Sequence, residues 1–117
     1  MAEEAFISSY VVDDDILVIK LHGKLDAVTS PEFTAEVDKH FQQGKRKIII
    51  DCAHLGYISS FGIGTLVTLQ TRLRKQGGEV KLASIQALVA EVFKVVHLDR
   101  LLEIYGDIEF ARESFYK

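Results

Sequence analysis

The chain has 117 residues, of which 48% are hydrophobic and 26% are charged, and its formal net charge is −3. These values fit a single domain over residues 1–117 with an ordinary core. No apolar stretch is long enough to span a bilayer, which argues against a membrane protein. No signal peptide precedes the first expected strand, and the basic run 45–47 is too short for a nucleic-acid surface. We therefore expect a cytoplasmic protein that contacts neither membrane nor nucleic acid directly.

The first half of the chain predicts a hairpin followed by a helix. Alternating residues over 6–12 and an apolar run over 16–21 predict two strands, joined by a turn at Asp13-Asp14-Asp15. Ser30-Pro31-Glu32 then predicts a helix start, with Ser30 as the cap. Gly44 is placed to end this helix. Its buried face would carry residues that repeat every four positions: Phe33, Val37 and Phe41.

The middle of the chain predicts a buried strand and a second helix. The β-branched residues 48–50 lie within a strand-like run from Lys47 to Asp51, and such a run is typical of a strand covered on both faces. A helix is expected from Ile63 to Lys75, with Gly77-Gly78 as its stop. Its apolar residues are Ile63, Leu66, Val67, Leu69 and Leu73. Cys52 is the only cysteine, so it cannot form an internal disulfide, and we expect it to be buried.

The last third predicts two more strands and two more helices. Strands are expected over 80–83 and 101–105, and Ser84 and Asp107 are expected to cap the helices that follow them. The apolar residues of these helices are Leu88, Val89, Val92 and Phe93 in the first, and Phe110 and Phe115 in the second. The order is β-β-α-β-α-β-α-β-α, which predicts an α/β fold with a mixed sheet flanked by helices.

The most informative segment is the run from Tyr57 to Gly64, which joins the central strand to the second helix. It places Ser59 and Ser60 where backbone N–H groups lack helical partners. A serine there is most simply a helix cap. A phosphoserine is the second interpretation, since a helix start accommodates negative charge. Gly62 and Gly64 lack the third glycine of a dinucleotide fingerprint, so close backbone packing is the simpler explanation.

Other polar residues do not form a recognisable catalytic or metal site. The histidines at 22, 40, 54 and 97 show no metal-ligand spacing, and the acidic run 13–15 lacks the remaining ligands of a calcium loop. No set of nucleophile, base and acid can be assembled, so we expect neither an enzyme nor a cofactor. Asp26 is either a solvated loop carboxylate or a contact to a partner. Arg72, Arg74 and Lys75 fit the positive end of a helix.

The order and spacing of four segments resemble those of STAS domains. The segment 48–64 is similar to that family's central motif, in which an apolar strand ending in Asp is followed by a short loop and a serine-glycine helix start. The segment 23–26 resembles the family's Gly-x-Leu-Asp before the first helix, 77–82 resembles its fourth strand and the entry to it, and 96–99 resembles the loop before its last strand. More narrowly, the chain resembles bacterial anti-sigma factor antagonists. It departs from their motif at Ser59, where Asp is common, and at Phe61, where a small residue is common.

The resemblance implies a phosphoprotein that acts in signal transduction and transcription regulation. Ser60 matches the serine phosphorylated in that family, with Ser59 as a rival acceptor, and Asp26 would lie near the kinase. The implied partners are an anti-sigma factor that is also a serine kinase, of histidine-kinase-like ATPase fold, and a PP2C-type phosphatase. The residues expected to contact the partner are Asp26, Ser59, Phe61, Gly62, Gly64, Thr65, Thr68 and Arg72. Thr65, Thr68 and Arg72 recur at three- and four-residue spacing, so they are expected to share one helix face. In this scheme of partner switching, the unmodified domain binds the anti-sigma factor and phosphorylation releases it.

Two other classes of function remain open from the sequence. The chain could be a constitutive STAS scaffold in a lipid transporter or a larger signalling assembly, and Ser59 and Ser60 would then only cap a helix. An α/β enzyme is the third possibility, and the missing catalytic set argues against it.

Overall fold

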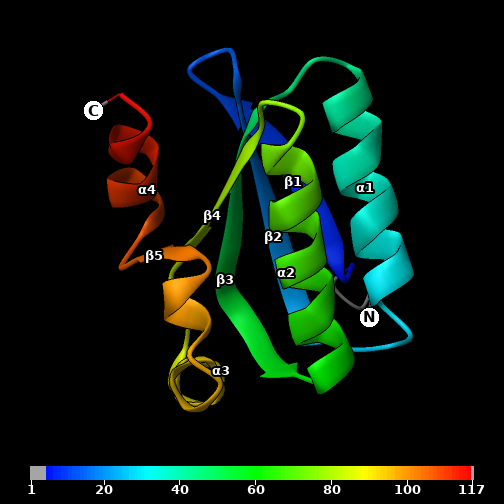
Figure 1. Ribbon diagram of the computed structural model, residues 1–117, viewed down its shortest axis with the longest axis vertical. Coiled ribbons are helices and arrows are strands. Elements are labelled where there is room, and N and C mark those ends of the chain that lie inside the picture. The colour runs from blue at the N-terminus through cyan, green and yellow to red at the C-terminus, as the bar shows by residue number, and fades with distance from the viewer. Residues whose placement is uncertain (1–4, 117) are drawn as a thin grey trace.

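Five strands form one sheet in the order β1-β2-β3-β4-β5, with helices on both faces (Figure 1). The computed structural model describes residues 5–116. The element order confirms the α/β prediction, with one added 3₁₀ turn, η1. The elements are β1 (Ile7–Val12), β2 (Ile16–Leu25), α1 (Ser30–Gln42), β3 (Lys47–Ile58), α2 (Ser60–Arg74), β4 (Glu79–Ala83), α3 (Ala87–Val95), η1 (Leu98–Arg100), β5 (Glu103–Tyr105) and α4 (Ile108–Ser114).

The sheet is mixed because its first two strands form a hairpin and the rest run parallel. β1 pairs antiparallel with β2, while β2, β3, β4 and β5 pair parallel in turn. Asp13 and Asp14 adopt positive φ in the turn between β1 and β2, which confirms the predicted acidic turn. Figure 1 shows α1 and α2 side by side over the sheet, both running from the lower end of the view to the upper end.

Alternate residues of the central strands pack into two separate cores. Ile48 and Ile50 face the larger core beneath α1, α2 and α3, whereas Ile49 faces a smaller core covered by α4. All three side chains are fully buried, which confirms the prediction of a strand covered on both faces. Cys52 is also buried, as expected. Among the helices in residues 5–116, none is both long enough and apolar enough to cross a membrane.

The two central strands extend further than their apolar runs indicate. β3 continues to Ile58, so residues 52–57 are strand rather than the expected loop, and β2 continues to Leu25. The cause is pairing between the two strands, in which Leu25 lies opposite Ile58 after two irregularities in register. Conversely, β5 is shorter than predicted and holds only Glu103–Tyr105. These ladder bonds are long-range interactions, which a local sequence pattern does not report.

Two predicted helix caps are wrong and one is confirmed. Thr29, not Ser30, precedes the first residue of α1, and Ser30 is already helical. Ser84 adopts a left-handed conformation with φ 62°, so the chain turns before α3 and Gln86 takes the cap position. The side chain of Asp107 accepts a hydrogen bond from the N–H of Phe110 at 2.8 Å, as predicted.

Two of the apolar residues named for the last two helices are exposed. Leu88 on α3 is 75% exposed and Phe110 on α4 is 62% exposed, because these helices are short and present only one side to the sheet. The buried contacts of α3 are made by Val89 and Phe93, and that of α4 by Ala111.

Candidate functional site

The two adjacent serines at the start of α2 have different structural roles. Ser59 is the N-cap residue, and its side-chain oxygen accepts a hydrogen bond from the N–H of Gly62 at 3.2 Å. Ser60 is the first residue of the helix, three residues earlier than predicted. It is exposed, and its hydroxyl makes no hydrogen bond to any residue in the described part of the chain. The capping role therefore belongs to Ser59, and the Ser60 hydroxyl is left available.

A glycine at the third position of α2 lets this helix start rest on the end of β2. A Cβ atom at Gly62 would lie within 3.0 Å of the carbonyl group of Leu25 and of the side chain of Ile58. The N–H of Ser59 also donates to the carbonyl of Leu25 at 3.0 Å. This confirms close backbone packing as the reason for Gly62, but the same explanation is wrong for Gly64, where an added Cβ atom would meet nothing within 4 Å. The result is a fixed position for Ser60 relative to the loop after β2.

Asp26 lies in that loop and organises the start of α1. One of its carboxylate oxygens accepts hydrogen bonds from the N–H groups of Val28 at 3.0 Å and Thr29 at 3.1 Å. Its own carbonyl accepts the N–H of Ser30 at 2.9 Å. The hydrogen bond from Thr29 is the main reason that the pKa of Asp26 is lowered. Asp26 is therefore more than a solvated loop carboxylate, and it lies next to the strand end that supports Ser59.

The exposed side of α2 faces α1 across a groove. Thr65, Thr68 and Arg72, predicted to share one face, all line this groove together with Gly64 and Phe61. Arg72 pairs with Asp38 of α1, with nitrogen and oxygen 2.8 Å apart. These three residues are thus on one face, as expected, but that face is one wall of a groove rather than an isolated helix surface.

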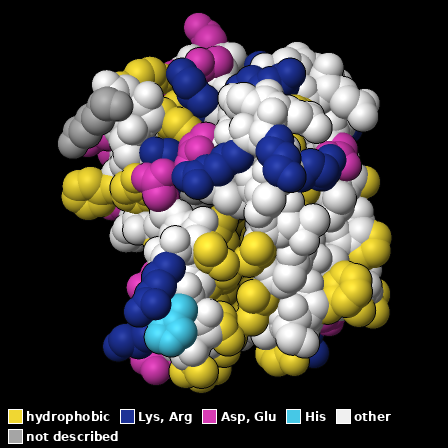
Figure 2. All heavy atoms as spheres, in the orientation of Figure 1, with side chains coloured by type: hydrophobic (Ala, Val, Ile, Leu, Met, Phe, Trp, Pro, Cys, Tyr) yellow, Lys and Arg dark blue, Asp and Glu magenta, His cyan; other side chains and the backbone are white. Residues whose placement is uncertain are grey.

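Most of the groups around the start of α2 are apolar or uncharged. Phe61 is 57% exposed and lies beside Ser60 in the first turn of α2. Figure 2 shows Lys and Arg side chains gathered over the upper end of α2, whereas the lower end, where the helix begins, is surrounded mainly by apolar and uncharged groups. A double negative charge placed at Ser60 would therefore change the character of this surface.

The histidines are less scattered than their positions in the sequence indicate. His22 on β2 and His54 on β3 lie opposite each other, and their rings stack with centroids 5.0 Å apart and planes 3° apart. Within residues 5–116, no group of three or more His, Cys, Asp or Glu side chains is arranged to hold a metal ion. Burial raises the pKa of the Cys52 thiol to about 12, with the nearby Asp51 charge as a second cause.

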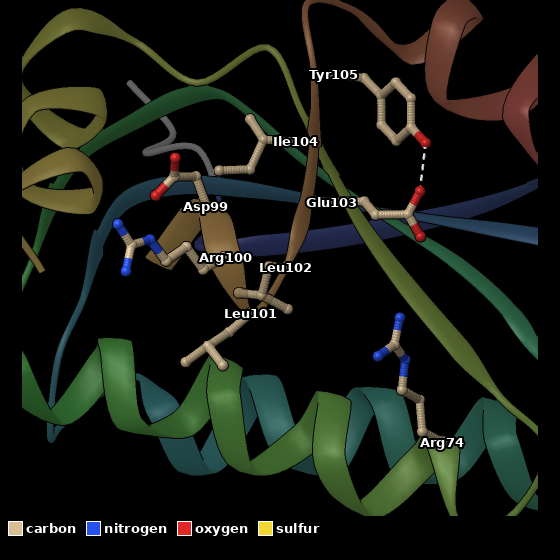
Figure 3. Close-up of a pocket in the computed structure, with 8 residues that line it drawn as sticks. All are labelled: Arg74, Asp99, Arg100, Leu101, Leu102, Glu103, Ile104 and Tyr105. Atoms are coloured by element: carbon tan, nitrogen blue, oxygen red, sulfur yellow. Dashed lines mark hydrogen bonds between the residues drawn. The ribbon is translucent and has the colours of Figure 1, made fainter. Parts of the chain in front are cut away.

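A second hollow, beside β5, shows no arrangement of catalytic groups (Figure 3). Its volume is about 340 Å³. Two of its polar side chains are hydrogen-bonded: Arg74 donates to Glu79, outside the lining, at 3.1 Å, and the Tyr105 hydroxyl donates to Glu103 at 2.6 Å. Arg74 is the last residue of α2 and Ser60 the first, so this hollow and the serine lie at opposite ends of one helix.

Sequence reasoning missed the contribution of α1 to this surface. Ser30, Thr34 and Asp38 line the groove from the α1 side, with Pro31 and Ala35 between them. Their spacing of four residues places them on one helix face. That spacing was available in the sequence, but the apolar repeat of Phe33, Val37 and Phe41 on the adjacent, buried side of α1 gave the stronger signal.

Comparison with known proteins agrees with this fold. Residues 8–111 match the family described as the STAS domain. The chain belongs to the STAS domain family. A relative from Bordetella bronchiseptica, named as a putative anti-sigma factor antagonist, BtrV, is 26% identical over 102 residues, which cover 87% of this chain and 88% of that protein.

Solved structures show the same architecture. The crystal structure of a putative anti-sigma factor antagonist from Thermotoga maritima has a TM-score of 0.87 and 25% identity, and the match covers 95% of each chain. The Bacillus cell fate determinant SpoIIAA, solved in a phosphorylated form, has a TM-score of 0.71 and 22% identity, with 93% of this chain and 98% of that chain covered. This second likeness concerns the fold.

Proposed function

We propose that this protein is an anti-sigma factor antagonist that acts by partner switching, with Ser60 as the phosphorylated residue. The observation that carries the proposal is the division of roles between Ser59 and Ser60. Ser59 caps α2, while Ser60 presents an exposed hydroxyl that has no structural role in the described residues. Modification of Ser60 would therefore leave the fold intact. The names of the relatives from Bordetella and Thermotoga support the same role.

A phosphate on Ser60 would act mainly on binding. It adds nearly two negative charges at pH 7, and the start of α2 would accept them because the helix dipole favours negative charge there. The same charges would oppose a partner that covers the surface, since burying an unpaired charge is costly. A penalty of about 3 kcal/mol corresponds to a more than hundredfold loss of affinity. The unmodified protein would hold the anti-sigma factor, and the modified protein would release it.

The partner surface of this proposal combines three segments that the fold brings together. They are the loop around Asp26, the start of α2 from Ser59 to Gly64, and the face of α2 that carries Thr65, Thr68 and Arg72. The contact between Gly62 and Leu25 holds the first two segments against each other. The partner would be an anti-sigma factor that is also a serine kinase of histidine-kinase-like ATPase fold, and a PP2C-type phosphatase would restore the unmodified serine.

The decisive experiment incubates the protein with ATP and a candidate anti-sigma factor kinase, followed by phosphopeptide mapping. We expect one phosphate, on Ser60, in the protein without substitutions and in Ser59→Ala, and no phosphate in Ser60→Ala. Calorimetry should then show that Ser60→Asp binds the partner more weakly than Ser60→Asn, which matches it in size without the charge. Equal binding of Ser60→Asp and Ser60→Asn, together with no phosphate in cells, would replace the switch with a constitutive STAS scaffold.

A further inference from the structure

The groove between α1 and α2 has the dimensions of a small-molecule site. Its volume is about 810 Å³, within the range of roughly 300–1,000 Å³ that is typical of such sites. It extends along both helices from their first turns to the pair formed by Asp38 and Arg72. The eight helical steps of α1 from Ser30 to Asp38 correspond to roughly 12 Å of helix. This bounded length suits a compact molecule better than a long peptide.

The lining of the groove defines the charge of its ligand. Asp38 and Arg72 are the only charged residues that line it in the described part of the chain, and they pair with each other at 2.8 Å. No unpaired charge therefore faces a ligand. The remaining lining is apolar or carries hydroxyl groups: Ser30, Pro31, Thr34, Ala35, Phe61, Gly64, Thr65, Thr68 and Leu69. An uncharged molecule with an apolar body fits this lining.

One polar group at the floor of the groove lacks a partner. Ser30 lines the groove and is 2% exposed, and its side-chain oxygen makes no hydrogen bond. It does not cap α1, because Thr29 occupies the cap position. Buried hydroxyls are normally hydrogen-bonded, so an unpaired one beside a hollow indicates where a ligand atom can bind. A serine hydroxyl is carried on one rotatable bond, so a change of rotamer can present it to the groove.

We propose that the groove between α1 and α2 binds an uncharged amphipathic small molecule, with a ring or short alkyl body and one hydroxyl group that hydrogen-bonds to Ser30. The apolar body would lie between Ala35 of α1 and Leu69 of α2. The proposal does not depend on partner switching, since Ser30 and the other α1 residues of the groove lie outside the proposed partner surface. The groove and that surface overlap along α2, where they share Phe61, Gly64, Thr65, Thr68 and Arg72.

The test uses two probes of similar shape, p-cresol and toluene. Binding of each probe is monitored by the amide chemical shifts of the protein in nuclear magnetic resonance titrations. We expect p-cresol to shift residues along the facing sides of α1 and α2 and to bind more tightly than toluene by about two- to tenfold, the value of one neutral hydrogen bond. In Ser30→Ala this advantage of p-cresol should disappear while toluene still binds. Equal affinities for the two probes in the unmodified protein would overturn the proposal.

Two variants that fill the groove test its location. Ala35→Trp and Thr34→Trp place an indole ring in the groove from α1 and should abolish the shifts. Ala87→Trp is the matched control, because Ala87 is exposed at the start of α3 and lines none of the hollows described above. It should leave binding unchanged, and circular dichroism should show native helix content in all three variants. Shifts centred on β5, or binding that persists in both groove-filling variants, would contradict the assignment.

Discussion

Leu25 and Gly62 approach each other so closely that no side chain larger than hydrogen fits between them. A Cβ at Gly62 would lie within 3.0 Å of the Leu25 carbonyl group. The same carbonyl oxygen accepts the N–H of Ser59 at 3.0 Å. The end of β2 therefore contacts both the cap of α2 and its first turn. Asp26 is the next residue along the chain after Leu25. The geometry of the candidate site depends on this contact.

The substitution Gly62→Ala should be destabilising, while Gly64→Ala should not be. The added methyl group at Gly62 meets backbone atoms, which cannot move aside, so we expect a loss of about 1–3 kcal/mol in the free energy of unfolding. At Gly64 a Cβ meets no atom within 4 Å, and replacing a helical glycine by alanine stabilises by about 0.5–1 kcal/mol. Urea unfolding measures both variants. Equal effects of the two would show that the contact with Leu25 is not restrictive.

The two serines at the start of α2 should differ in their effect on stability. Ser59→Ala removes the hydrogen bond to the N–H of Gly62 and should lower the free energy of unfolding by about 0.5–2 kcal/mol. Ser60→Ala removes a hydroxyl that makes no such bond and should change it by no more than about 0.5 kcal/mol. Thermal unfolding of the two variants, side by side, distinguishes the cap from the exposed serine. A larger loss in Ser60→Ala would reverse the assignment.

Cys52 should be unreactive while the protein is folded. Burial raises the pKa of its thiol to about 12, and the thiol reagent needs the thiolate. At pH 8 a disulfide-exchange reagent should react with the denatured protein and hardly at all with the native one. Since the folded pKa lies above its ordinary value of 9.0, the stability from this group is complete below about pH 9 and is lost as the pH rises toward 12. Rapid native labelling at pH 8 would contradict the burial.

The sequence predicted the element order because each helix and strand carries its own local signal. The run at 48–50 and the four-residue repeat from Phe33 to Phe41 are examples, and both proved to be buried. The misjudged positions are those decided by distant partners. β3 extends to Ile58 because β2 pairs with it, and Ser84 is not a cap because the chain turns there with positive φ.

The sequence indicated the α2 residues and Asp26 as a candidate site, but neither their geometry nor the α1 residues beside them. The motif around Ser59 and Ser60 did not reveal which of the two caps α2, since both are serines at a helix start. Nor did it show that α1 forms the second wall of the groove, because that depends on how two helices pack on the sheet. The stacking of His22 on His54 follows from strand register and likewise has no signature in the sequence.

Asp26 should link the stability of the loop before α1 to pH. Hydrogen bonds from the N–H groups of Thr29 and Val28 hold the pKa of its carboxylate below the ordinary value of 3.8. A lowered pKa means that the contribution is present above about pH 3.8 and is lost as the pH falls through the folded value. The melting temperature of the unmodified protein should therefore fall below pH 4, in part because of Asp26.

Two substitutions at Asp26 separate charge from geometry. Asp26→Asn keeps an oxygen that accepts the same N–H groups, so its melting temperature at pH 7 should stay close to that of the unmodified protein, and its decline below pH 4 should be shallower. Asp26→Ala removes the acceptor and should lower the melting temperature at every pH. Differential scanning calorimetry from pH 7 to pH 3 measures both. If Asp26→Ala had the same melting temperature as the protein without substitutions at pH 7, the carboxylate would have no structural role. If Asp26→Asn also remained folded yet was phosphorylated more slowly at Ser60, the charge itself would be the feature that the kinase requires.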